Sequence, residues 1–192
     1  MKTMLKLCLK ATLFSLVLGY FNTPLAEPAM PTGAVVLTVV GDIANTNRPA
    51  FDAQKDSFFN YHKLQFEQAM AFDRDMLMAL ETQKIRVGMP TGGAVHELEG
   101  PLLKEILNAT GVTYPATLII TALDGFKIAL DPAMLDAHDW IVALKQDGQY
   151  LGLGGKGPIW VVFPPAASDG IASKEEVGGW PWASFVIEVD RK

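Results

Sequence analysis

Apolar residues along the chain occur in short runs separated by turn-forming residues, a pattern typical of β-strands. Runs rich in β-branched and aromatic residues predict strands at 34–40, 117–122, 126–130, 140–144, 159–163 and 183–189. A shorter run at 85–89, which stops at Pro90, predicts one more strand. Asp124-Gly125 and Asp147-Gly148 fall between such runs and predict tight turns. The pattern therefore favours a domain rich in sheet.

Helical spacing of apolar residues is confined to two segments. It predicts a helix over 101–110, with Pro101 in the first turn and Gly111 as the C-terminal cap. Asp73 is a candidate N-cap for a short helix that runs to Glu81. Both predicted helices are short, so we expect them to pack beside the predicted sheet without forming a separate helical layer.

Two stretches carry weaker patterns. Residues 55–70 are ambiguous between a helix and an edge strand, and the part from 64 to 70 favours a strand. Residues 166–179 predict a polar loop. No internal repeat or linker divides the chain, so we expect one domain over 34–192, of α+β class and mainly β sheet, with a few short helices.

The first residues have the composition of a secretory signal peptide. Three lysines lie around and before an apolar run, 13–20, and Asn22-Thr23-Pro24 follows it. We predict residues 1–26 as the signal, cut after Ala26 with Ala29 as the alternative, and residues 27–33 as an extended leader. An uncleaved anchor is the other interpretation, but the uncharged run is shorter than the ~20 residues that a spanning helix needs. The prediction is a periplasmic protein with no membrane insertion after cleavage.

Charge and cysteine content narrow the function classes. The whole chain has a net charge of −5, and removal of the lysine-bearing signal would make it more acidic. An acidic chain without a basic run is a poor partner for nucleic acid, because it would release no phosphate counterions. The single cysteine, Cys8, lies inside the predicted signal, so we expect a mature chain with no disulfide and no thiolate.

The residues of common catalytic and metal sites are not arranged in their usual motifs. The three histidines lie far apart in the sequence and match no zinc-binding spacing, which predicts no metal site. The stretch 152–158 is glycine-rich and contains Lys156, but Gly157-Pro158 and an apolar run follow it instead of Ser or Thr and a helix. This stretch is therefore no phosphate loop of a nucleotide hydrolase. It is either a flexible connection or a loop that brings amides and an ammonium to a ligand.

Aromatic residues concentrate towards the C-terminus, where Trp160, Trp180 and Trp182 lie close in sequence. Trp160 belongs to an apolar strand and is expected in the core. Trp182 lies between Pro181 and the last strand, and it is the better candidate for stacking on a planar ring.

The order of these elements resembles the oxidoreductase molybdopterin-binding domain of sulfite oxidase and its relatives. The resemblance covers nearly all of the predicted mature chain, and it rests on the segments 36–43, 72–80, 98–107, 123–126, 157–164 and 182–189. Among these, Gly100-Pro101-Leu102 is similar to the family's glycine-x-proline-leucine start of a helix, and Gly157-Pro158-Ile159-Trp160 to its glycine-proline strand. The chain departs from the family at the cysteine that ligates molybdenum, since Met89-Pro90-Thr91-Gly92 stands there. Trp160 replaces the arginine that follows the glycine-proline pair.

The resemblance implies a periplasmic pterin-binding protein that is no enzyme and relays a pterin signal to the periplasmic domain of an inner-membrane cyclic-di-GMP enzyme. The expected ligand-binding residues are Thr91, Asp124, Lys156, Gly157 and Trp182, around a cleft between the 89–94 loop, the 154–158 loop and Trp182. Asp124 is equally well explained as a turn residue, and Lys156 as a solvated loop lysine. The first alternative function is a molybdopterin-dependent oxidoreductase or accessory protein that lacks the cysteine ligand. The second is a binding module that acts through a protein surface.

Overall fold

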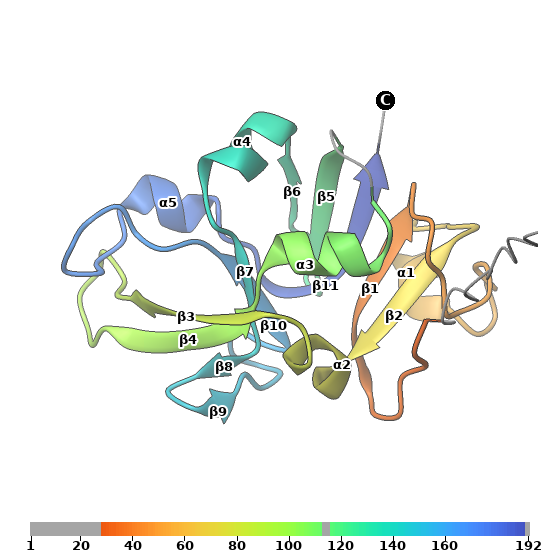
Figure 1. The fold of residues 1–192 in the computed structure, drawn as a ribbon, viewed down its shortest axis with the longest axis horizontal. Coiled ribbons are helices and arrows are strands. Elements are labelled where there is room, and N and C mark those ends of the chain that lie inside the picture. The colour runs from red at the N-terminus through yellow and green to blue at the C-terminus, as the bar shows by residue number, and fades with distance from the viewer. Residues whose placement is uncertain (1–27, 113–115, 191–192) are drawn as a thin grey trace, which may run out of the picture.

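The protein folds into two β-sheets with five short helices around them (Figure 1). The structure is a computed structural model that describes residues 28–112 and 116–190. The predicted signal peptide and Cys8 lie outside these residues. Of the predicted leader, residues 28–33 are described, and they contain no strand or helix. The prediction of a mainly β domain with a few short helices is confirmed.

The larger sheet has seven strands and curves into a half-barrel. Its strands are β1 (Val35–Gly41), β2 (Ala69–Asp73), β5 (Thr117–Ala122), β6 (Lys127–Leu130), β7 (Ile141–Ala143), β10 (Ile159–Val162) and β11 (Trp182–Asp190). The strand order is β2-β1-β11-β10-β7, and the β5–β6 hairpin pairs with β11 through β5. Only the β1–β11 pair is parallel. The long strand β11 thus joins the first and last parts of the chain at the centre of the molecule.

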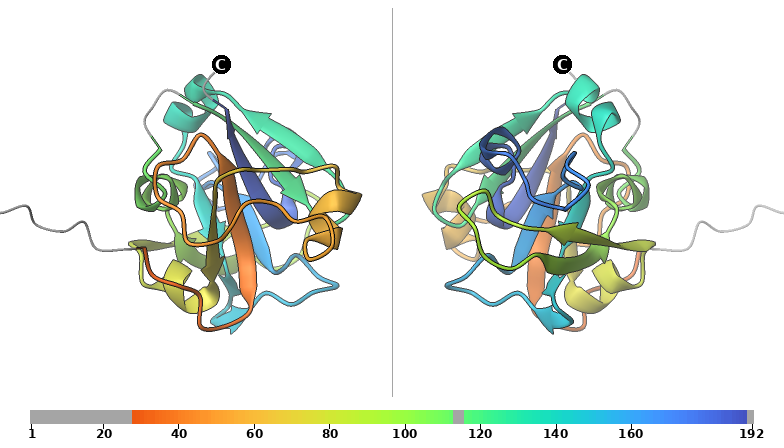
Figure 2. Two further views of the ribbon diagram at one scale, coloured as in Figure 1. Left: turned by 90° about the vertical axis from the view of Figure 1, so that its right-hand side faces the viewer. Right: turned by 90° about the vertical axis from the view of Figure 1, so that its left-hand side faces the viewer.

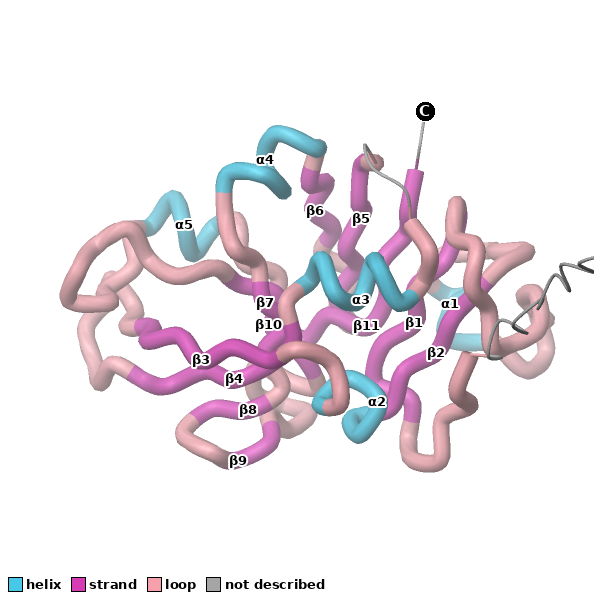
Figure 3. The backbone as a smooth tube through the Cα atoms, in the orientation of Figure 1, coloured by secondary structure: helices cyan, strands magenta, loops and turns pink. Residues whose placement is uncertain are grey.

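The smaller sheet has four antiparallel strands in the order β3-β4-β8-β9 (Figure 3). They are β3 (Thr82–Val87), β4 (His96–Pro101), β8 (Lys145–Gln146) and β9 (Gln149–Tyr150). The two sheets meet where β4 crosses β7. A Cβ atom on Gly100 would lie 2.0 Å from the carbonyl oxygen of Val142, so only glycine permits this approach of the two backbones.

The helices are α1 (Ser57–Tyr61), α2 (Arg74–Met78), α3 (Leu103–Ala109), α4 (Pro132–Ala137) and α5 (Lys174–Gly178). Asp73 caps α2 as predicted, since its Oδ1 accepts a hydrogen bond of 2.8 Å from the Met76 N–H. At α5, Ser173 and Glu176 form a capping box. Among the described residues, no helix has the length and apolar character needed to cross a membrane.

The core is one large apolar cluster that lies between the sheets and α3, with a smaller cluster beneath α1. Trp160 and Trp180 are buried in or against the large cluster. The predicted core position of Trp160 is confirmed.

Most predicted strands are found within a few residues of their expected bounds, and three predictions need correction. The stretch 64–70 is mainly loop, because β2 begins only at Ala69, and α1 occupies part of 55–63. Pro101 ends strand β4 and is not in the first turn of α3, whose N-cap is Leu102. The strand β4 itself and the helices α4 and α5 were not predicted. The last of these lies inside the expected loop at 166–179.

Candidate functional site

One cavity brings together two of the five predicted ligand-binding residues. The β5–β6 turn, the end of α5 and the start of β11 enclose about 260 Å³. Its lining residues are Asp124, Phe126, Val177, Gly178, Trp180 and Trp182. Figure 2 shows the β5–β6 hairpin and α5 on neighbouring parts of the face that its right-hand view presents. We define these six residues as the tryptophan cavity.

Asp124 presents a carboxylate at this cavity from the tip of the hairpin. Its Oδ1 accepts a hydrogen bond of 2.9 Å from the Phe126 N–H, which closes the Asp-Gly turn. Gly125 follows with φ of 90°, a conformation that glycine adopts without strain. Among the described residues, no other group donates a hydrogen bond to this carboxylate. The turn therefore fixes one oxygen and leaves acceptor capacity for a ligand.

The two cavity tryptophans differ in exposure. Trp182 is 47% exposed at the first position of β11, whereas Trp180 is 2% exposed. Trp182 pairs with Trp160 across β10 and β11, so its backbone is held in the centre of the larger sheet. An exposed indole on a fixed backbone is suited to stacking on a planar ring.

The Trp180 indole carries an unused donor. Its Nε1 is buried and has no hydrogen-bond partner among the described residues. Buried polar groups in proteins are nearly always paired, so this donor is an exception. Because the atom has essentially no accessible surface, it does not face the cavity, and Trp180 contributes to the cavity wall through other atoms of its side chain or backbone.

Lys156 and Gly157 lie beside the tryptophan cavity but do not line it. The Lys156 carbonyl accepts a hydrogen bond of 2.8 Å from Ala183 N–H, and the Ala183 carbonyl accepts one of 2.9 Å from Leu123 N–H. Through these two bonds, the start of β11 is hydrogen-bonded to the glycine-rich loop on one side and to the β5–β6 turn on the other. Three predicted site segments that are far apart in sequence are therefore neighbours in the structure.

The ammonium of Lys156 is directed at an aromatic ring. Its Nζ lies 4.3 Å from the centroid of the Trp160 ring, within the range of a cation–π interaction. Burial lowers the pKa of Lys156 below its usual value. Lys156 is therefore a partly buried lysine on an indole, and not the fully solvated loop lysine that was the alternative.

Gly157 is required by packing. A Cβ atom there would lie 2.5 Å from the carbonyl carbon and oxygen of Leu151. This close packing makes Gly157 part of the backbone framework that supports the loop. Its peptide bond to Pro158 is cis.

Thr91 lies in a different part of the molecule. It is at the tip of the β3–β4 hairpin, which belongs to the smaller sheet and points away from the larger one (Figure 1). Thr91 does not line the tryptophan cavity. The predicted cleft between the 89–94 loop and Trp182 is thus replaced by a cavity whose far wall is α5.

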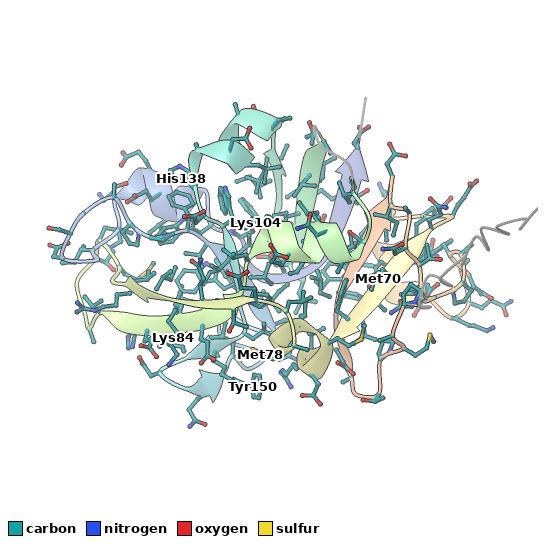
Figure 4. All side chains as sticks on the ribbon, in the orientation of Figure 1. Met70, Met78, Lys84, Lys104, His138 and Tyr150 are labelled. Atoms are coloured by element: carbon teal, nitrogen blue, oxygen red, sulfur yellow. The ribbon has the colours of Figure 1, made fainter. Side chains whose placement is uncertain are left out.

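The described residues contain no group of three or more His, Cys, Asp or Glu side chains placed to hold a metal ion. His138, on the side of α4 near α5 in Figure 4, stacks on Phe163 with ring centroids 3.8 Å apart. His96 contacts Asp147 at 2.6 Å, on the exposed side of the smaller sheet. Each of these histidines is held by a structural neighbour.

Comparison with models of protein families finds none that matches the chain, and comparison with curated proteins finds no significant similarity. The chemistry open to the site therefore follows from its own geometry.

Sequence reasoning missed the α5 side of the cavity, which contributes Val177 and Gly178. The signal was present as Ser173 followed three residues later by Glu176, the spacing of a capping box. The sequence pattern predicts Phe126 as the first residue of a strand, whereas in the structure it precedes β6 and lines the cavity.

Proposed function

We propose that the protein binds a pterin in the tryptophan cavity and has no catalytic activity of its own. The observation that carries the proposal is the presence of Trp182, as an exposed indole, and Asp124, as a carboxylate, on the walls of one cavity. The resemblance of the sequence to the sulfite-oxidase-type pterin domain selects a pterin among planar heterocycles.

The chemistry of a pterin matches these two groups. Its flat bicyclic ring stacks on an indole, and its amino group and adjacent ring N–H form a pair of donors that a carboxylate accepts. In this arrangement, stacking on the indole provides affinity, and the carboxylate orients the pterin by binding the ring edge that carries the amino group and the ring N–H.

The volume of the cavity agrees with a compact ligand. About 260 Å³ is slightly below the ~300 Å³ at which small-molecule pockets usually begin, so a bare ring system is favoured over a long conjugate. A pterin with a phosphate-bearing tail would extend into solvent.

The alternative of a molybdopterin enzyme needs a protein ligand for the metal. A thiolate is the soft ligand expected in this family, and Cys8 is the only cysteine of the chain and lies outside the described residues. The described donors do not fit a molybdenum centre, and the proposed function involves no redox step at that metal.

The biological role proposed for the bound pterin is signalling. In this proposal the loaded protein acts in the periplasm on the periplasmic domain of an inner-membrane cyclic-di-GMP enzyme. The role rests on the sequence resemblance, and its test comes after ligand binding is established.

The experiment is analysis of the small molecules that the native protein carries. We would purify the protein from the periplasm, denature it, and examine the released material by fluorescence and mass spectrometry, with molybdenum measured on the same sample. A simple pterin without stoichiometric metal is the expected result. A molybdenum-bearing pyranopterin would instead restore the enzyme alternative.

A further inference from the structure

A second, larger cavity lies next to the β5–β6 turn, where Leu123 is one of its lining residues. It measures about 480 Å³ and is bounded by β1, α1, the glycine-rich loop and Arg74. Its lining residues include Leu123 and Phe185, and none of them lines the tryptophan cavity. In the left-hand view of Figure 2, α1 and the light-blue loop that contains Leu153 project on the same side of the molecule. We define this space as the arginine cavity.

The walls of the arginine cavity are apolar, and several of its large side chains are exposed. Val35 is 49% exposed, Phe58 44% and Leu153 74%. Isolated exposed apolar residues are common on protein surfaces, whereas these three line one cavity, an arrangement suited to an apolar ligand. Contact with an apolar ligand would remove this surface from water.

The two arginines that line the cavity are not equivalent. Arg48 is neutralised, because its Nη2 lies 2.6 Å from Asp56 Oδ1 and its guanidinium also packs on Phe59 and Phe66. Arg74 has no carboxylate within 4.0 Å among the described residues, and its Nε is buried without a hydrogen-bond partner. One unneutralised cation therefore lies in the wall of an otherwise apolar space.

The orientation of Arg74 is fixed by its neighbours. It occupies the first position of α2, behind the Asp73 cap, and its guanidinium carbon lies 5.1 Å from the centroid of the Tyr150 ring. Tyr150 is at the lower edge of the molecule in Figure 4, on β9. A guanidinium held in this way retains donors for a planar anion such as a carboxylate.

We propose that the arginine cavity binds an amphiphilic monoanion, a medium-chain alkyl carboxylate. The alkyl chain lies against Val35, Phe58 and Leu153, and the carboxylate pairs with the Arg74 guanidinium. The volume falls in the range of ligand pockets, about 300–1,000 Å³. This site is separate from the pterin proposal, and either can fail without the other.

The test is calorimetric titration of the purified full-length protein with octanoate and, in parallel, with 1-octanol. The alcohol has the same chain length but no charge, so the comparison isolates the contribution of the carboxylate. Arg74→Gln removes the cation, and Arg86→Gln, an exposed arginine on β3 outside the cavity, is the matched control. Leu153→Ser tests the apolar wall at a position whose exposure makes loss of folding a minor concern.

We expect octanoate to bind one site at least about tenfold more tightly than 1-octanol, because a charge-assisted hydrogen bond is involved. Arg74→Gln should abolish that preference, Leu153→Ser should weaken both ligands, and Arg86→Gln should leave both unchanged. The proposal is overturned if neither ligand binds, if both bind equally, or if Arg74→Gln retains the preference for octanoate.

Discussion

At the residue scale, one carboxylate oxygen of Asp124 stabilises the β5–β6 turn. We propose that the remaining acceptor capacity of the carboxylate binds the ligand. The hydrogen bond from Phe126 N–H to Oδ1 explains why an Asp suits this turn without any ligand. The two roles separate in a variant that keeps the acceptor and loses the charge.

We therefore expect Asp124→Asn to weaken pterin binding by roughly tenfold or more, since hydrogen bonds to charged groups contribute about 1.5–3 kcal/mol. Its free energy of unfolding should stay within about 0.5 kcal/mol of the wild type. Fluorescence titration with a pterin and urea denaturation give the two values.

The matched control is Asp169→Asn, because Asp169 Oδ1 accepts from Ile171 N–H at 2.9 Å in the same two-residue pattern. This variant should leave pterin affinity unchanged. Equal weakening by both variants would mean that the Asp124 carboxylate has no specific role in binding.

Asp73 carries the clearest pH dependence of stability. Its carboxylate accepts from Met76 N–H, and also from Thr32 and Gly33 N–H at 2.8 Å. These backbone bonds, led by Met76, hold the pKa of Asp73 below its usual value. A lowered pKa in the folded state means that this stabilisation is complete above the unfolded-state value of about 3.9 and is lost as the pH falls through the folded-state pKa.

Asp73→Asn should lower the free energy of unfolding by about 1–2 kcal/mol at pH 7, because the amide cannot satisfy all three donors. The difference in free energy of unfolding between the variant and the wild type should become smaller below about pH 4. Urea denaturation at several pH values measures this, with Asp75→Asn, an exposed neighbour on α2, as the control. If this difference in free energy of unfolding stayed constant down to pH 3, the stabilising role of the ionised Asp73 carboxylate would be contradicted.

At the scale of elements, the glycine-rich loop 152–158 lines the arginine cavity through Leu153 and Pro158, and its path depends on one glycine. A side chain at Gly157 would overlap the Leu151 carbonyl, whereas Gly152 has nothing within 4 Å of its Cβ position. The same substitution in the same loop therefore has two different expected outcomes.

Gly157→Ala should destabilise the protein by about 3 kcal/mol or more, as an overlap with backbone requires the loop to move. Gly152→Ala should change the stability by less than about 1 kcal/mol. Thermal and urea unfolding of both variants check this. If both are neutral, the loop does not follow the path described.

The elements that were not predicted from the sequence, β4, α4 and α5, were missed for one physical reason, which is that their apolar pattern is weak. Strand β4 alternates buried Leu98 and Gly100 with polar residues, but its sequence is too polar for this alternation to stand out. Helices α4 and α5 contain no fully buried residue, so no apolar periodicity marks them. In the sequence, these two helices are indicated only by their N-terminal caps, Asp131 before Pro132 and the capping box that begins at Ser173.

At the scale of the whole molecule, strand content and the mainly β class could be predicted because apolar runs and Asp-Gly turns are local signals. The parallel pairing of β1 with β11 could not, since it joins residues at opposite ends of the chain. The site depends on a different long-range pairing, the antiparallel pairing of β5 with β11, which places Trp182 beside the Asp124 turn. Thr91 belongs to the other sheet and lies apart from the cavity.

The central claim is that a pterin stacks on Trp182, and the most direct measurement is the dissociation constant of a pterin for the wild type and for Trp182→Ala. Loss of one stacking partner should weaken binding by roughly 5- to 150-fold, by analogy with the roughly 1–3 kcal/mol of base stacking on aromatic residues. Tyr61→Ala, which removes an aromatic residue that is 79% exposed outside the cavity, should bind as the wild type does. Unchanged affinity in a folded Trp182→Ala variant would contradict the account.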